Sequence, residues 1–436
     1  MTAPASPSAV SGPQAARLVV IGAVVGVPAA LFAALFVALV HKLEHWFWHD
    51  LPHHLDASGP PWYLVLGLPL VGACVVLAAR TLLPGDGGHE PLGGISVVPT
   101  PLAHAPGVAL AAVGSLAFGA VLGPEGPLIA LGSVVGVAVA SLARVKAPER
   151  AVLSTAGSFS AISALFGGPL VAGMLLLEAG VGLGASLIPI LIPGLVAASI
   201  GYLIFVGLGD WGGLDTTALS VPGLPAYQSV HLRDLVIAVG AGVVMALLVE
   251  AVRRLATRIA SPGRAQVGMP VLLLGGAFVV GALALLADGL GASSQDVLFS
   301  GQTSIPNLVS EDSATIVLVL IAAKALAYAV CLGCGFRGGP VFPAIFLGVA
   351  LGILAVIAFD VSPTLAVAVG TAAGTAAMTR LLFASIIFAG LLVGTAGVDA
   401  VPAAALAAVA AWLTMAAIDE RFPVRRLAST SDVAPG

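Results

Sequence analysis

The sequence Gly123-Pro124-Glu125-Gly126-Pro127 stands between two uncharged apolar runs, residues 108–122 and residues 128–140. Each run is apolar enough for the interior of a lipid bilayer. An ionisable side chain at that depth is costly unless it faces water or a partner, so such residues usually mark a functional site. We therefore interpret Glu125 as part of a functional site inside a membrane.

The glycines and prolines around Glu125 predict a helix that begins beside an ion. Pro127 suits the first turn of a helix, because the N–H group that proline lacks has no partner there. Glycine leaves backbone N–H groups accessible, and these groups attract anions together with the helix dipole. The Glu125 carboxylate can occupy the same place, so we predict a gate that protonation opens. The anion-binding residues predicted in this motif are Gly123, Pro124, Gly126 and Pro127.

The composition of the chain is that of an integral membrane protein. Of its 436 residues, 59% are hydrophobic and 9% are charged, whereas a soluble domain carries about 25% charged residues. Helices are expected, because open sheets leave backbone groups unsatisfied in lipid. The chain also holds 54 glycines and 30 prolines, which interrupt helices. Broken helices at membrane depth are tolerated where they line a cavity, so the composition favours a transporter or channel.

Apolar runs divide the membrane part into two halves. We expect a disordered tail over residues 1–14, a first half over 15–207, a loop over 208–230, a second half over 231–418 and a short tail over 419–436. Each half begins with a long apolar run and continues through a break rich in Gly and Pro into shorter apolar pieces. The shared layout predicts an internal repeat.

Basic residues indicate which segments face the cytoplasm. Arg17, Arg80 and the arginines of residues 253–264 should lie inside, whereas residues 41–56 and 208–230 should lie outside. Both termini are then cytoplasmic, and the chain crosses the cell membrane several times. The two halves then have opposite orientation. The sequence therefore predicts an all-α inverted-topology repeat with broken helices and a substrate site near the middle of the membrane.

Three breaks, at residues 87–92, 123–127 and 338–343, can point helix N-termini at one place. Converging positive ends of helix dipoles suit an anion rather than a cation. The sequence also lacks the acidic ring that a cation pathway needs. The further anion-binding residues that we predict are Gly88, His89, Gly338, Gly339, Pro340, Val341 and Phe342.

These motifs resemble the signatures of the CLC family of chloride channels and chloride/proton antiporters. Residues 123–127 resemble Gly-Arg-Glu-Gly-Pro, with Pro124 in place of the arginine. Residues 338–343 resemble Gly-Gly-x-Phe-x-Pro, with Val341 in place of the phenylalanine. The stretch from 166 to 173, which leads to Glu178, is similar to a third family motif. The resemblance spans roughly residues 17–417 and implies the CLC fold.

The resemblance also implies an assembly and a cargo. It implies a homodimer with one ion pathway per subunit and with contacts near residues 186–207 and 382–417. It implies gated chloride transport with Glu125 as the gating glutamate, with protons as a candidate second cargo and without a cofactor or nucleic acid. The chain ends too soon for the cytoplasmic CBS domains of some members, so the prokaryotic type is expected.

Several positions depart from the family pattern. The first family motif, Gly-Ser-Gly-Ile-Pro, falls on residues 88–92, so that His89 or Gly88 replaces the serine that coordinates the anion. The family tyrosine near the C-terminus has no counterpart. The inner proton-transfer glutamate falls on Ala179, one residue past Glu178. The gate is therefore kept, while the hydroxyl ligands and the inner proton acceptor are lost.

These departures leave the transport mode open. Ala179 favours a channel or an uncoupled transporter, whereas Glu178 or water could still relay protons in a chloride/proton antiporter. The altered first motif also allows a transporter of fluoride or another anion. Two structural alternatives remain, since Glu125 could pair with Arg337 or Lys324 and Glu178 could be a structural carboxylate at a helix end.

An enzyme or a metal site is less well supported by the sequence. The histidines gather mainly in residues 41–54, and their spacings match no recognised metal site. An intramembrane enzyme would need His and Asp side chains that converge at membrane depth. We therefore expect no metal site and no enzymatic activity.

Overall fold

The computed structural model describes residues 12–57, 59–95, 98–180, 187–212, 220–261 and 268–422. Most of the tails predicted at 1–14 and 419–436, and part of the loop predicted at 208–230, therefore lie outside the described residues. The α-helices are α1 Gly12–His45, α2 Leu51–His54, α3 Trp62–Leu82, α4 Ala105–Leu116, α5 Glu125–Leu142, α6 Ala147–Leu165, α7 Pro169–Ala179, α8 Leu187–Gly212, α9 Leu232–Ile259, α10 Met269–Gly289, α11 Ser294–Val297, α12 Ile305–Val309, α13 Ala314–Cys334, α14 Val341–Phe359, α15 Pro363–Thr379, α16 Leu382–Val393 and α17 Val401–Arg421.

The helices have the lengths of a membrane protein with interrupted spans. Within the described ranges, nine helical segments are long and apolar enough to cross a bilayer. Helices α4 and α7, with 12 and 11 residues, are too short to do so, because a span needs roughly 20 residues. The chain is therefore a multi-pass membrane protein that contains the broken helices expected from its glycines and prolines.

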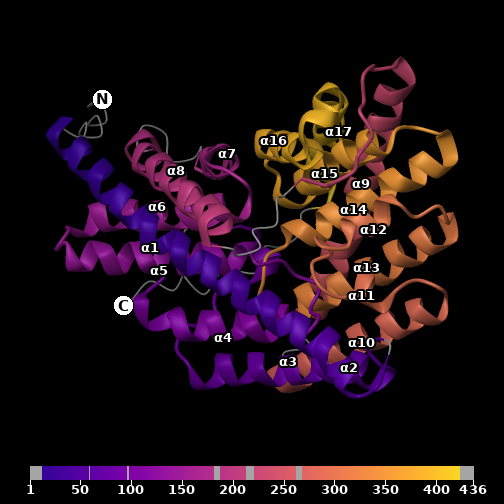
Figure 1. Ribbon diagram of the computed structural model, residues 1–436, viewed down its shortest axis with the longest axis horizontal. Coiled ribbons are helices and arrows are strands. Elements are labelled where there is room, and N and C mark those ends of the chain that lie inside the picture. Colours follow the sequence, from indigo (N-terminus) through magenta and orange to yellow (C-terminus); the bar gives the residue numbers. More distant parts are fainter. Residues whose placement is uncertain are drawn as a thin grey trace.

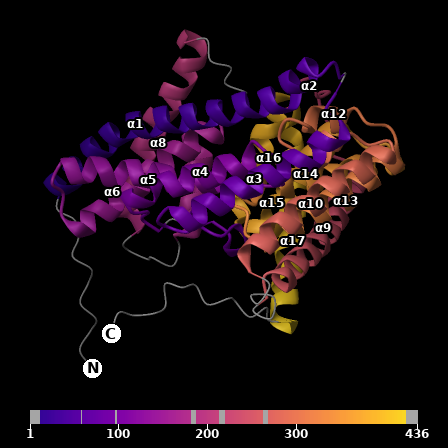
Figure 2. The ribbon, with the colours of Figure 1, turned by 90° about the horizontal axis from the view of Figure 1, so that it is seen from below.

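The two halves of the chain repeat one packing scheme. In the first half α5 packs on α6, α6 on α8 and α8 on α1. In the second half α14 packs on α15, α15 on α17 and α17 on α9. Figures 1 and 2 show the halves as two adjoining bundles, indigo to magenta and orange to yellow. The predicted internal repeat is confirmed, with α1 equivalent to α9, α5 to α14 and α8 to α17.

Small residues let the paired helices of each half approach closely. Gly132 of α5 faces Gly157 of α6, and a Cβ atom on either glycine would overlap the backbone of the other. Gly348 of α14 and Gly370 of α15 face each other in the same way. Close backbone contact through small residues is how helices associate in lipid, where burial of apolar surface gives little driving force. The equivalent pairs α5–α6 and α14–α15 thus share one mode of packing.

Equivalent elements also meet across the boundary between the halves. Helix α3 packs on α10 and α7 packs on α16. Gly123 and Gly339 form a reciprocal antiparallel bridge, in which each N–H donates to the carbonyl of the other glycine, at 2.8 and 2.6 Å. Antiparallel pairing of equivalent segments is the arrangement that a two-fold axis between inverted halves produces. This axis brings the N-termini of α5 and α14 together.

Candidate functional site

The Glu125 carboxylate lies on the N-terminus of α14. Its Oε1 atom accepts hydrogen bonds from the backbone N–H groups of Val341, at 2.6 Å, and Phe342, at 3.2 Å. These donors are free because the first N–H groups of a helix have no intrahelical acceptor. The side chain is 1% exposed. A negative group thus occupies the anion-attracting end of a helix inside the protein.

Two glycines form the slot that holds this carboxylate. A Cβ atom added to Gly123 would overlap Oε2 of Glu125, and one added to Gly339 would overlap its Cδ. The bridge between these two glycines closes the slot on the backbone side. The Oε2 atom is buried and has no hydrogen-bond partner within the described part of the chain. One carboxylate oxygen is therefore held and the other is unpaired.

The alternative that Glu125 is a structural ion-pair partner does not match the observed contacts. Arg337 instead donates to both the side chain and the backbone carbonyl of Asp86, at 2.6 and 3.1 Å. Lys324 donates to the carbonyls of residues 296–299, at 2.8 to 3.3 Å. Both cations are therefore committed elsewhere, and Glu125 is held by backbone N–H groups alone.

Two cavities approach Glu125 from opposite sides of its motif. The larger, of about 210 Å³, is lined by Gly126 and Pro340 together with His89, and we call it the His89 cavity. The smaller, of about 40 Å³, is lined by Pro124 together with Glu44, and we call it the Glu44 cavity. Because Pro124 and Gly126 flank Glu125 in the chain, the turn that carries Glu125 forms the partition between the two cavities, and the buried side chain itself lines neither.

The His89 cavity collects residues from all three predicted breaks. Gly88 and His89 come from the first, Gly126 from the second, and Gly338 and Pro340 from the third. The expectation that a helix begins at 87–92 is wrong, however. A three-residue 3₁₀ turn, Pro91–Gly93, follows there, and the next α-helix is α4. The positive φ of Gly94, 81°, explains this, because it takes the backbone out of helical conformation directly after the turn.

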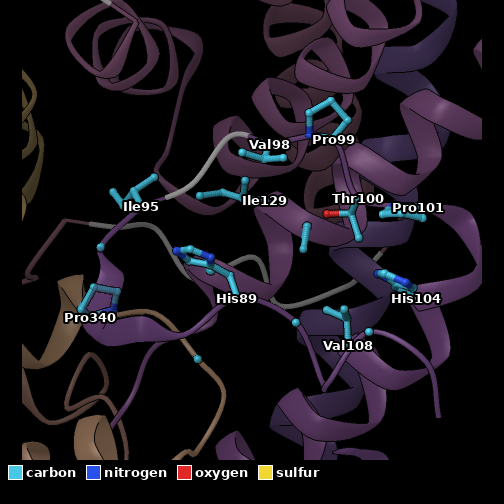
Figure 3. A pocket seen from close by; sticks show the side chains of 16 residues that line it. His89, Ile95, Val98, Pro99, Thr100, Pro101, His104, Val108, Ile129 and Pro340 are labelled. Carbon is cyan, nitrogen blue, oxygen red and sulfur yellow. The ribbon is translucent and has the colours of Figure 1, made fainter. Parts of the chain in front are cut away.

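Sequence reasoning missed two side chains of this cavity. Thr100 and His104 also line it, and Figure 3 shows the Thr100 hydroxyl pointing into it, with His89 and His104 on different walls. Thr100 thus supplies a hydroxyl to the cavity, although the first motif has none. Both residues follow the motif in a segment with three prolines between 99 and 106, and no pattern in the sequence distinguishes them.

Partial burial and a nearby cation set the charge of the His89 cavity. Desolvation, followed by the charge of Arg337, lowers the pKa of His89 below its ordinary value of 6.5. Burial also lowers the pKa of Arg337 to about 10, so this guanidinium keeps its charge at neutral pH. His89 is therefore neutral near pH 7, while the charge of Arg337 close to the cavity is paired with Asp86 and Glu90.

Aromatic side chains surround the N-terminus of α14. Phe342 packs against Phe166 and Phe388, with ring centroids 5.8 and 6.1 Å apart. The Tyr328 hydroxyl, buried on α13, donates to the Pro340 carbonyl at 2.6 Å. Tyr328 was also missed by the sequence analysis, because it lies outside the motifs. These rings exclude water from the helix end, which strengthens electrostatic interactions there.

Glu178 lies at another helix N-terminus. Its carboxylate oxygens accept the backbone N–H groups of Leu382, Phe383 and Ala384, at 2.9, 2.8 and 2.8 Å, and so cap α16. Helix α7, which carries Glu178, packs on α16. This geometry is that of the structural carboxylate considered above, while its role as a proton relay stays a prediction.

Known relatives cover most of the chain. It is 31% identical over 327 residues to the putative ion-transport protein YfeO of Escherichia fergusonii, in a match that spans 70% of this chain and 71% of the relative. The YfeO protein of Shigella boydii matches with the same identity and coverage. Relatives named as putative ion-transport proteins thus align with about 70% of this chain at 31% identity.

Solved structures share the fold over nearly the whole length. A slow cyanobacterial Cl⁻/H⁺ antiporter aligns with a TM-score of 0.73 and 17% identity, covering 92% of this chain and 95% of the other. A CLC-type fluoride/proton antiporter aligns with a TM-score of 0.70 and 19% identity, covering 92% and 96%. At such identities the likeness concerns the fold. Both structures therefore support the broken-helix inverted repeat described above.

The family assignment rests on a sequence match that begins inside the first break, at His89, and includes the other two breaks. Residues 89–415 match the model of the voltage-gated chloride channel family. This range includes Glu125, the α14 N-terminus and most of both halves. The chain belongs to the voltage-gated chloride channel, or CLC, family.

Proposed function

We propose that the protein carries anions, with chloride as the first candidate, across the membrane along a pathway that Glu125 gates. The observation that carries the proposal is the position of the Glu125 carboxylate, bound to the α14 N-terminus in the partition between two cavities. An anion would use the same N–H donors, so carboxylate and anion exclude each other. Protonation removes the charge that holds the carboxylate there and frees the donors.

The cargo proposal follows from the chemistry of the partition. The backbone N–H groups of the predicted residues Val341 and Phe342 are the donors to a negative charge, whereas those of Gly123 and Gly339 bond to each other and hold the slot in place. Backbone N–H groups at a helix end can replace the water around an anion. Fluoride or another anion remains a second candidate, which is favoured by the loss of the motif serine at His89 and by the likeness to a fluoride/proton antiporter.

The proposal is tested by anion efflux from liposomes that hold the purified protein, with the external pH recorded at the same time. Wild-type efflux should be slow at neutral pH and rise on acidification, because protonated Glu125 leaves the α14 N-terminus. The variant Glu125→Gln should show efflux that no longer depends on pH. Unchanged pH dependence in this variant would contradict the gate.

The same recording separates the transport modes. Proton movement in a fixed ratio with chloride indicates an antiporter, and Glu178 would then be tested as the inner relay. Chloride efflux without proton movement indicates a channel, the mode that Ala179 favours. Fluoride efflux that is faster than chloride efflux assigns the second candidate cargo. A variant with its carboxylate elsewhere on the protein, Glu311→Gln, controls for non-specific effects of removing a charge.

A further inference from the structure

Glu44 is a second carboxylate beside the gate that the proposed mechanism does not use. It lies in the last turn of α1 and is half-buried. It lines the Glu44 cavity together with His41, which is one turn earlier on the same helix. No hydrogen-bond or ion-pair partner is found for its carboxylate in the part of the chain that the structure describes. Because residues 41–56 are predicted to face outward, this carboxylate is accessible to protons from the external solution.

The wall of the Glu44 cavity is the turn that holds the gate. Leu122 and Pro124 both line the cavity. Gly123, between them, lies against Oε2 of Glu125 so closely that a Cβ atom would overlap this oxygen. Oε2 is the unpaired oxygen, whereas Oε1 is bound to α14. The unpaired oxygen therefore lies against the turn that forms this wall of the cavity.

The cavity has the size and the polar lining to hold water. Its volume of about 40 Å³ exceeds the roughly 15 Å³ that one water needs. Ser300, Gln302 and Thr303 line it as well, and their polar groups can serve as hydrogen-bond partners for water. A water in this space can bind Glu44, and it can reach Glu125 when the Leu122–Pro124 turn moves, because Glu125 itself does not line the cavity.

Glu44 is the acidic residue in the lining of the Glu44 cavity. Among the described residues that line it, His41 and Glu44 are the titratable ones. The loop of residues 299–303 contributes neutral side chains. The ammonium of Lys324 lies behind this loop, where it is bound to the Phe299 carbonyl at 3.3 Å. Glu125 itself lies behind the Leu122–Pro124 turn.

We propose that Glu44 relays protons between the solution and Glu125, an inference that rests on the proposed gating role of Glu125. The protonated Glu44 carboxyl gives its proton through water to Oε2 of Glu125. Glu44 becomes a carboxylate and is protonated again from the solution. Glu125 becomes a neutral acid and releases the N–H groups of α14. The reverse transfer closes the gate.

The test compares pH profiles of anion efflux from liposomes, with the same pH on both sides, for wild type, Glu44→Gln, Glu125→Gln and the double variant. Glu44→Gln should slow efflux near neutral pH by about tenfold or more, because positioned proton-transfer groups contribute on the order of 10²-fold and water replaces part of this effect. Efflux at the acidic plateau should match wild type. Glu44→Asp, which keeps a proton carrier, should restore the profile.

The double variant shows whether Glu44 acts through the gate. Glu44→Gln should have no effect in the Glu125→Gln background, because no proton is then needed. Slower efflux in that background would overturn the relay, because Glu44 would then affect the pore itself or the folding of the protein. Gel filtration of each variant would distinguish these two effects. A Glu44→Gln profile identical to wild type would also overturn it. Persistence of pH dependence in Glu125→Gln alone would instead contradict the gate, so the two proposals fail in different ways.

Discussion

At Glu125, a single carboxylate oxygen occupies two N–H donors that would otherwise be open to an anion. The slot is only as wide as this group, because Gly123 and Gly339 leave no room for a methyl group beside it. In the proposed mechanism, the competition between the carboxylate and an anion for these donors therefore depends on the width of the slot and on the protonation of Glu125. Changes of single atoms at these residues should shift it.

Gly339→Ala should expel the carboxylate from its slot. The added Cβ would overlap the Cδ and Cγ atoms of Glu125, and this side chain can turn away more easily than the backbone can move. Anion efflux at neutral pH should then rise several-fold and lose most of its pH dependence. The control is Gly275→Ala in α10, where the structure leaves open space around an added Cβ. Efflux from Gly339→Ala that remains slow and pH-dependent would contradict this view of the slot.

His89 should make the larger cavity more attractive to anions in acid. Because its pKa is lowered below 6.5, it is neutral at pH 7 and gains a positive charge only at pH values below that. In the Glu125→Gln background, where the gate no longer titrates, acidification should lower the half-saturating anion concentration by about two- to tenfold, since the new charge is partly screened by solvent. His89→Gln should abolish this change, and its persistence there would assign it to another group.

At the level of elements, the same kind of contact joins the two halves at two places. Glu125 binds the N-terminus of α14, and Glu178 of α7 binds the N-terminus of α16. In both cases a carboxylate of the first half caps a helix of the second. The aromatic contact between Phe388 of α16 and Phe342 of α14 links the two capped helices. Movement of one helix end can therefore be transmitted to the other through this ring contact.

Removal of the Glu178 cap should destabilise the contact between α7 and α16. Glu178→Ala leaves three N–H groups without their acceptor, at a cost of about 1–3 kcal/mol. The melting temperature in detergent should fall by a few degrees. Glu178→Gln keeps an acceptor oxygen and should restore most of the stability. If Glu178 also relays protons, Glu178→Gln should stop proton movement while anion efflux continues, and unchanged proton movement would leave it as a cap alone.

At the scale of the whole molecule, the antiparallel meeting of Gly123 and Gly339 creates the site. The equivalent stretches Gly123–Pro127 and Gly339–Pro343 share the spacing Gly-Pro-x-x-Pro, and α5 and α14 each begin two residues after the glycine. Glu125 therefore occupies the position that Val341 occupies in the other half. The Glu125 carboxylate thus binds the N–H of Val341, the residue at the equivalent position of the other half. The backbone is symmetric here, whereas only the first half supplies a charged side chain.

The orientation of the molecule in the membrane can be tested directly. The basic residues predict that His53, in α2, faces outward and that Arg258, at the end of α9, faces the cytoplasm. Both are exposed. With Cys74 replaced by alanine, a membrane-impermeant maleimide should label His53→Cys on intact cells and Arg258→Cys only after permeabilisation. The opposite pattern would reverse the assigned sides, and with them the direction in which the Glu44 cavity faces.

The homodimer stays a prediction of the family resemblance. The expected contact regions correspond to α8 and to α16 and α17 with the turn between them. Large apolar side chains are exposed on these helices, among them Ile188 and Leu413. Such side chains would also suit lipid. Cross-linking in membranes at low protein density would distinguish the two surroundings.

The amino-acid sequence by itself determined the class of protein, the interrupted helices, the internal repeat and the position of the carboxylate that we propose as the gate. These properties are local. Low charge and long apolar runs define membrane helices, and Gly and Pro mark where helices must begin or end. Glu125 could be identified from the sequence because a carboxylate between two long apolar runs is rare whatever the fold.

Only the tertiary structure decided what each of these residues meets. The N–H donor of Val341 is 216 positions from Glu125, and Arg337 finds Asp86 across 251 positions. In a bilayer, helices with similar apolar surfaces can pair in many ways, so the hydrophobic pattern does not specify partners. The choice is made by close backbone contacts at glycines and by the two-fold relation of the halves. For this reason the sequence could not indicate that Thr100, His104 and Glu44 line the two cavities on either side of the Glu125 turn.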